Sequence, residues 1–291
     1  MLQQLLSLLG IRPSDAYRRT NPLILVNGLA EQGESWYLNQ REWQKHYAVH
    51  LPGVLVYDGP VMQQRLEDGK PVTIDFLTER LAEYLDRFVQ TPPYHLVASS
   101  LGGQIAIEYA SRFRDKVGKI VLLCPSGVGS EERLPIMEAV RHKNFQGLVE
   151  STFYNHRSAS PGVAEYYRQK FANKAWRRAM FETVRGTKNH SVRGKLPLVD
   201  RPVLVICGRE DRIVDPHAVR EAVEGFPNYR FTLIPNCGHA PQLECSRLVN
   251  RMVLNFLKSN PAAVPVAGPV AALQPATAED AADASWSSQS R

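Results

Sequence analysis

The fold of this chain is decided by the stretch Tyr94-His95-Leu96-Val97-Ala98-Ser99-Ser100-Leu101-Gly102-Gly103. A short apolar run ends in a serine that has small residues, Ala98 and Gly102, two positions before and after it. This pattern predicts a strand that turns sharply into a helix, with Ser100 at the apex and its hydroxyl exposed. Small residues are needed because a strained turn leaves no space for larger neighbours. The stretch therefore makes Ser100 a candidate nucleophile.

Two alternatives concern the serines themselves. Ser99 is a competing nucleophile, but in its frame the residue two positions further on is Leu101, which is too bulky for the turn. Ser100 could also act only as the N-cap of the helix that begins near Leu101, a common role for serine. Ser100 is favoured as a nucleophile over an N-cap only if the chain also supplies a base and an acid.

A serine hydroxyl is a weak nucleophile and needs a histidine base that is itself oriented by a third group. The chain has eight histidines. If the order is nucleophile, acid and then histidine, only His217 and His239 remain eligible. The others either precede Ser100 or fall in a segment with helical spacing: His46, His50, His95, His142, His156 and His190.

The candidate acid follows an apolar run at 202–208, which predicts a buried parallel strand that delivers Asp211 to its carboxyl end. A helical stretch at 216–225 and an alternating strand at 229–234 then lead into the loop that carries His239. The carboxyl ends of parallel strands joined by one helix lie side by side. We therefore expect Asp211 and His239 to meet above the sheet.

Each of these residues also has a simpler interpretation. Asp211 could be a loop aspartate that caps a turn, although Asp215, directly before a proline, fits that role better. His239 could be a polar loop residue. His217 lies at the start of the connecting helix, and we expect it to face solvent.

Together these pieces resemble the α/β-hydrolase fold of the capped, lipase- or esterase-like kind. The resemblance implies a mostly parallel, doubly wound sheet with an inserted helical cap. It also implies Ser100 as nucleophile, Asp211 as orienting acid and His239 as general base, with an oxyanion hole made by the backbone N–H groups of Leu29 and Leu101. The matching pieces are 22–29, 98–103, 208–211 and 237–244.

The chain departs from the family pattern at two places. Family members commonly have His-Gly where this chain has Asn27-Gly28, so the hydrogen bonds that support the oxyanion loop must differ. Only about twenty residues precede the first strand, so we expect the usual N-terminal hairpin to be shortened or missing. The segment Met1 to Ile11 instead has the pattern of a short amphipathic helix.

The 291 residues suffice for one large α/β domain with an insertion and a tail. We expect an N-terminal helical segment at 1–22, the α/β core at 23–127 and 202–260, and a helical cap at 128–201. The segment 261–291 contains ten Ala and four Pro without periodicity, which predicts a disordered tail.

The predicted cap carries the charge imbalance. Residues 131–200 hold thirteen Lys and Arg against seven Asp and Glu, an excess equal to the +6 net charge of the chain. This excess fits an ordinary solvated helical face, attraction of an anionic substrate, or a membrane or nucleic-acid surface. No nucleic-acid motif accompanies it, and no apolar stretch is long enough to span a bilayer.

The four cysteines show neither metal-ligand spacing nor a small-disulfide framework. We expect reduced thiols, a cytoplasmic protein, and a mechanism that needs no metal or cofactor. The expected partner is a small acyl or ester substrate, which the basic excess would favour in anionic form.

The sequence predicts a carboxylesterase-like serine hydrolase that works through a covalent acyl-enzyme. Hydrolysis of a carbon–carbon bond next to a ketone, or acyl transfer, are alternatives on the same fold. A second alternative is a non-catalytic protein that holds a small ligand in the capped cavity, since Asn27 and Ala98 both depart from the usual site. A third is a basic protein that binds an anionic surface.

Overall fold

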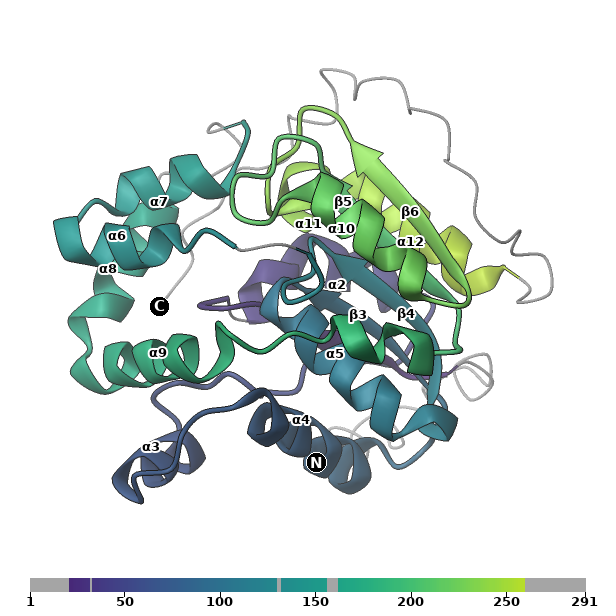
Figure 1. Cartoon of the computed structure of the whole chain (residues 1–291), viewed down its shortest axis with the longest axis horizontal. Coiled ribbons are helices and arrows are strands. Elements are labelled where there is room, and N and C mark those ends of the chain that lie inside the picture. Colours follow the sequence, from purple (N-terminus) through teal and green to yellow (C-terminus); the bar gives the residue numbers. More distant parts are fainter. Residues whose placement is uncertain (1–20, 32, 130–131, 156–161, 260–291) are drawn as a thin grey trace, which may run out of the picture.

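A computed structural model describes residues 21–31, 33–129, 132–155 and 162–259. Within these residues six strands form one sheet in the order β2-β1-β3-β4-β5-β6, and all neighbouring pairs are parallel (Figure 1). The strands are β1 (Leu23–Val26), β2 (Val49–His50), β3 (Tyr94–Ser99), β4 (Val117–Leu123), β5 (Val203–Gly208) and β6 (Tyr229–Ile234). The parallel sheet expected from the sequence is confirmed. The predicted N-terminal helix and hairpin region and the segment 261–291 lie outside the described residues.

Helices cover both faces of the sheet (Figure 1). Side chains alternate along each strand, so Leu23 and Leu25 join one hydrophobic cluster while Ile24 and Val26 join the other. The first face is covered by α2 (Tyr37–Trp43) and α12 (Ser246–Lys258), and the second by α4 (Ile74–Tyr84), α5 (Leu101–Arg112) and α10 (Pro216–Ala222). Because apolar residues occupy both sides of these strands, the sheet is buried on both faces, as a parallel sheet requires.

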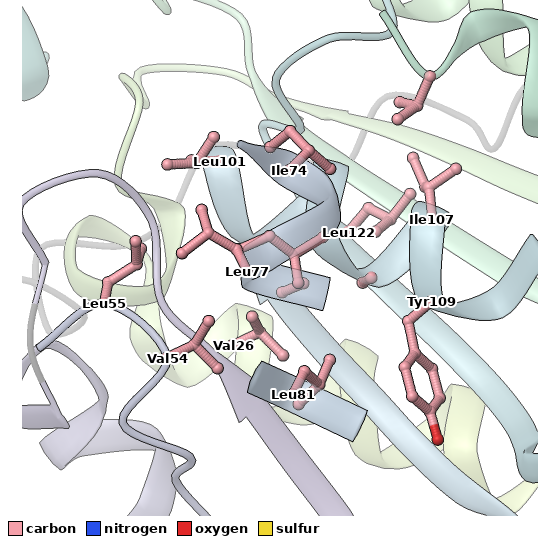
Figure 2. Packing of buried hydrophobic residues seen from close by; sticks show 14 of the residues in the cluster. Val26, Val54, Leu55, Ile74, Leu77, Leu81, Leu101, Ile107, Tyr109 and Leu122 are labelled. Atoms are coloured by element: carbon pink, nitrogen blue, oxygen red, sulfur yellow. The ribbon is translucent and has the colours of Figure 1, made fainter. Parts of the chain in front are cut away.

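Helix α4 shows how the sequence sets this packing (Figure 2). Ile74, Leu77 and Leu81 recur at helical spacing and are fully buried in the same cluster as Val26 and Leu122 of the sheet. Burying one such side chain contributes about 1.5–3 kcal/mol. The apolar stripe therefore fixes which face of α4 meets the sheet.

Among the residues that the structure describes between β4 and β5, four α-helices are found: α6 (Pro135–His142), α7 (Phe145–Thr152), α8 (Gly162–Ala172) and α9 (Lys174–Thr187). They gather at one side of the molecule, where α9 also lies beside α3 (Pro60–Glu67) (Figure 1). We call them the inserted helices. The helical content expected of this segment is confirmed, and none of the helices in the described ranges is both long and apolar enough to cross a bilayer.

Helical spacing continues from Ala164 to Phe181, but these residues belong to two helices, α8 and α9. The helix is interrupted at Asn173. The Asn173 side chain accepts hydrogen bonds from the backbone N–H groups of Ala175 and Trp176 and so N-caps α9. The break turns Trp176 inward, where it is fully buried. Periodicity alone misses this break because apolar residues continue on both sides of the cap.

Candidate functional site

Ser100 occupies the sharp turn between β3 and α5. Its φ of 49° and ψ of −118° are unusual for a residue with a side chain, as expected for a strained strand-to-helix turn. Gly102 is required because a Cβ there would lie 2.4 Å from the backbone oxygen of Val26. The Ser100 hydroxyl lies 3.3 Å from the hydroxyl of Ser126. Ser99 is fully buried, so it is not placed to act as the competing nucleophile.

The structure brings Asp211 and His239 together. Asp211 follows β5, His239 follows the neighbouring strand β6, and His239 Nδ1 lies 2.8 Å from Asp211 Oδ2. The other carboxylate oxygen of Asp211 accepts hydrogen bonds from the backbone N–H groups of Ile213 (2.8 Å) and Val214 (3.1 Å). The carboxylate is therefore held in one orientation toward the imidazole ring.

The two groups shift each other's pKa in opposite directions. Burial alone would raise the pKa of Asp211, but the charge and hydrogen bond of His239 and the two backbone N–H groups hold it below its usual value. Burial alone would lower the pKa of His239, but the Asp211 carboxylate, with a smaller contribution from Cys124, raises it well above the usual value. This pair therefore stabilises an imidazolium.

Neighbouring polar residues lie partly where the sequence predicts them. His217 is exposed, and Asp215 N-caps α10 by accepting a hydrogen bond from the His217 backbone N–H, both as predicted. His190 belongs to the segment with helical spacing but is not itself in a helix. It lies beyond the end of α9, lines the same cavity as Ser100, and its Nε2 is 3.4 Å from a Glu108 oxygen.

A cavity of about 380 Å³ opens at Ser100 and His239. Its walls come from both the sheet region and the inserted helices. Apolar side chains include Leu29, Leu101, Leu134, Ile136, Leu148, Val184 and Ile213, and basic side chains include Arg133 and Lys188. This mixture is typical of a small-molecule site, in which a few polar groups orient an otherwise apolar ligand.

The two predicted oxyanion donors belong to residues that line this cavity, Leu29 and Leu101. Asn27 is not among the residues that line the cavity. Its Oδ1 accepts a hydrogen bond from the indole N–H of Trp36 at 2.9 Å. The Gly28 N–H donates to Glu31 Oε2 at 2.9 Å. The supporting bonds of this loop therefore come from Trp36 and Glu31.

Sequence reasoning missed two acidic residues of the cavity. Burial raises the pKa of Glu31, and the hydrogen bonds from Gly28 and Ser99 offset this only in part. Glu132 behaves in the same way: burial raises its pKa, and its Oε1 accepts a hydrogen bond from the Gly127 N–H at 2.5 Å. A carboxylate in a loop carries no periodic signal, so only the tertiary structure reveals that these two are partly buried and line the cavity.

All four cysteines are free thiols and buried. Within the described residues, ligand atoms of Cys124, Asp211 and His239 lie within 4.8 Å of one another. Burial raises the pKa of the Cys124 thiol well above its usual value, and Asp211 and His239 already bond each other. This set does not fit a resident metal, because metal ligands must be deprotonated and available.

Comparisons with known proteins agree with this geometry. Residues 23–252 match the family described as the alpha/beta hydrolase family. Over 263 residues the chain is 23% identical to human monoacylglycerol lipase ABHD6, covering 81% of this chain and 75% of that one. Over 178 residues it is 31% identical to a 2-hydroxy-6-oxononadienedioate/2-hydroxy-6-oxononatrienedioate hydrolase of Paraburkholderia phymatum, covering 56% of this chain and 62% of that one.

Among solved structures, the enol-lactonase from Burkholderia xenovorans LB400 has the same fold. It superposes with a TM-score of 0.69 at 19% identity, covering 83% of this chain and 92% of that one. The match of the family to most of the chain, together with the parallel sheet and the strained serine turn, leads to one conclusion. This chain belongs to the alpha/beta hydrolase family.

Proposed function

We propose that this protein is a serine hydrolase that cleaves an ester-type acyl substrate, with Ser100 as nucleophile, His239 as general base and Asp211 as the group that orients the base. The observation that carries the proposal is the 2.8 Å contact between His239 Nδ1 and Asp211 Oδ2 beside a cavity that Ser100 also lines. A strained serine, a buried imidazole and an oriented carboxylate are the parts that acyl transfer needs.

In the proposed reaction, Ser100 Oγ bonds to the substrate carbonyl carbon while its proton passes to His239 Nε2. The backbone N–H groups of Leu29 and Leu101 stabilise the negative charge that develops on the carbonyl oxygen. The carbon–oxygen bond to the alcohol then breaks, and the alcohol leaves with the proton from His239. Water, deprotonated by the same imidazole, attacks the acyl-enzyme and releases the acid and the free Ser100.

The cavity lining supports an apolar acyl group. Leucine, isoleucine and valine account for seven of the residues that line it, beside polar residues and the acids Glu31 and Glu132. The side chains of Arg133 and Lys188 also line the cavity and are exposed to solvent. These cations support an anionic or polar end on the substrate, although solvent weakens the attraction at exposed sites. The relative named monoacylglycerol lipase supports an ester as the scissile group.

A second candidate is hydrolysis of a carbon–carbon bond next to a ketone. The 31% identity to the Paraburkholderia phymatum hydrolase supports it. The same nucleophile, base and oxyanion donors would serve, but a carbanion rather than an alkoxide would leave. A panel of chromogenic esters and of 2-hydroxy-6-oxo dienoates separates the two, because each candidate predicts turnover on one panel.

The proposal is tested with a fluorophosphonate probe, which modifies activated serines. We expect one covalent adduct per chain, on Ser100, lost in Ser100→Ala and strongly slowed in His239→Ala. His217→Ala is the matched control, because His217 is the exposed histidine nearest in sequence to the acid and should label at the wild-type rate. An unlabelled wild-type protein that still binds a small ligand in the cavity would favour the non-catalytic alternative.

A further inference from the structure

Glu31 joins two separate parts of the proposed oxyanion hole. It lies on the loop between β1 and α2, and its two carboxyl oxygens bond two different segments. Oε2 accepts the backbone N–H of Gly28, in the same loop, at 2.9 Å. Oε1 accepts the hydroxyl of Ser99, directly before the proposed nucleophile, at 2.9 Å. One partly buried side chain therefore links the oxyanion loop to the nucleophile turn.

The two linked segments are in tight contact. A Cβ added at Gly28 would lie 3.0 Å from Ser100 Cβ and 2.9 Å from Glu31 Oε1. The chain therefore needs glycine at this point so that the loop can approach the nucleophile. Without the Glu31 hydrogen bonds, nothing in this link would hold the Gly28 loop in its close contact with Ser100, and the loop could move away from the nucleophile.

The neighbouring groups extend this link. Ser99 Oγ also accepts a hydrogen bond from Gln242 Nε2 at 3.4 Å, and Gln242 lies three residues after His239. On the loop side, the Ala30 N–H donates to the Tyr57 hydroxyl at 3.0 Å. Leu29 thus lies between two backbone N–H groups that are each held by a side chain of the protein.

We propose that Glu31 is a positioning residue that holds the Leu29 and Leu101 backbone N–H groups in the relative geometry that stabilises a tetrahedral oxyanion. This inference rests on the proposed hydrolase function. Stabilisation requires donors about 2.7–3.1 Å from the oxyanion, so a small shift of the loop removes most of one donor's effect. Burial raises the pKa of Glu31 above its usual value, which makes a negative charge at this position less favourable than in water.

The test compares Glu31→Ala, Ser99→Ala and the double variant. Losing one oxyanion donor costs about 100- to 1000-fold in kcat, and a loosened donor should cost less, about 10- to 100-fold, with KM changed by less than about threefold. The double variant should lose no more than the worse single variant, because both changes break the same link. Glu31→Gln can still accept from Gly28 and donate to Ser99, so it should restore activity to within about threefold of wild type.

Two further measurements separate positioning from stability. The affinity for a boronic acid, which forms a tetrahedral adduct on serine, should fall in parallel with kcat, whereas affinity for a substrate analogue should not. Tm is recorded for every variant, and Glu224→Ala, an exposed acidic control, should match wild type in all readouts. If Glu31→Ala unfolds, Ser99→Ala and Glu31→Gln still test the link, since neither leaves a large void.

The outcomes distinguish this inference from the hydrolase proposal. A wild-type protein that neither labels with fluorophosphonate nor turns over an acyl substrate overturns both. A labelled wild type with unchanged kcat in Glu31→Ala overturns the positioning role alone. Multiplicative losses in the double variant, or a Glu31→Gln variant as impaired as Glu31→Ala, also overturn it.

Discussion

Asp211 and His239 are separated by 28 residues in the chain, yet His239 Nδ1 and Asp211 Oδ2 lie 2.8 Å apart. Their strands, β5 and β6, are adjacent and parallel, so the loops at the carboxyl ends of both strands meet at one edge of the sheet. The imidazole is nearly enclosed, with a side chain 7% exposed, and the carboxylate is 1% exposed. In this low-dielectric setting their interaction is stronger than it would be in water.

Replacing Asp211 with asparagine should remove most of the activity while leaving the fold. The amide keeps the size of the carboxylate but does not stabilise an imidazolium, and at equivalent sites this substitution lowers kcat by about 10⁴-fold. Steady-state kinetics on the best ester substrate measures the loss. Asp215→Asn is the control, because Asp215 only caps α10. Equal kcat in Asp211→Asn and wild type would rule out Asp211 as the orienting acid.

The pH dependence should reflect the raised pKa of His239. Activity requires the neutral imidazole, so kcat/KM should rise with pH through the pKa of the free enzyme. Burial opposes this shift, but the Asp211 carboxylate outweighs it, so the midpoint should lie above the usual value of about 6.5. In Asp211→Asn the residual activity should show a midpoint at lower pH than wild type. A wild-type midpoint below 6.5 would contradict the coupling.

A methyl group at position 102 should disrupt the nucleophile turn. The Cβ of Gly102→Ala would lie 2.4 Å from Val26 O and 2.7 Å from Asn27 O, both backbone atoms that cannot move aside cheaply. We expect a loss of about 1–3 kcal/mol in the free energy of unfolding and a fall in labelling of Ser100. Gly194→Ala is the control, since a Cβ there meets nothing within 4 Å. Urea unfolding and probe labelling measure the two effects.

Glu244 should make stability depend on pH. Its partly buried carboxyl accepts backbone N–H hydrogen bonds from Gly238 (2.8 Å), Tyr154 (2.9 Å) and Asn155 (3.1 Å), which link the His239 loop to the segment after α7. Burial nevertheless raises its pKa from about 4.5 to about 7. Between these values the folded protein binds more protons than the unfolded chain, so its stability falls as pH rises toward 7 and then levels off.

Glu244→Gln tests this expectation, because the amide does not titrate. Relative to wild type, the variant should gain stability as pH rises from about 4.5 to 7, with a slope of at most about 1.4 kcal/mol per pH unit. Urea unfolding at pH 5, 6, 7 and 8 gives the difference directly. Glu224→Gln, at an exposed acid, should show no such slope. A constant difference between Glu244→Gln and wild type would mean that Glu244 does not titrate in this range.

The local pattern of the sequence was sufficient for the elements that carry the proposed site. The strand predicted at 202–208 is found at 203–208, the strand predicted at 229–234 is found at those bounds, and the helix after Ser100 begins at Leu101 as expected. The apolar run at 119–124 likewise predicts a strand, and β4 covers Val117–Leu123, two residues earlier at its start and one at its end. These elements were predictable because continuous apolar runs between turn residues specify buried strands with little help from the rest of the chain.

The inserted helices were predictable only in outline. Their helical character followed from spacing, but the break at Asn173 depends on a side chain that caps α9, and the place of His190 depends on contacts with α5. Gln104 and Glu108 of α5 hold His190 against this helix: Gln104 Nε2 donates to the His190 carbonyl, and Glu108 Oε2 contacts His190 Nε2. Such contacts join residues more than 80 positions apart, and no local window contains both partners.

The sequence by itself determined that the chain forms a parallel sheet with a strained serine turn and carries an acid and a histidine after later strands, because short-range steric and hydrophobic patterns set these features. Only the tertiary structure decided that Glu31 hydrogen-bonds to both Gly28 and Ser99, and that the Asn27 side chain hydrogen-bonds to Trp36. The physical reason is that a hydrogen bond from a buried polar side chain depends on which distant groups the folded chain brings within about 3 Å.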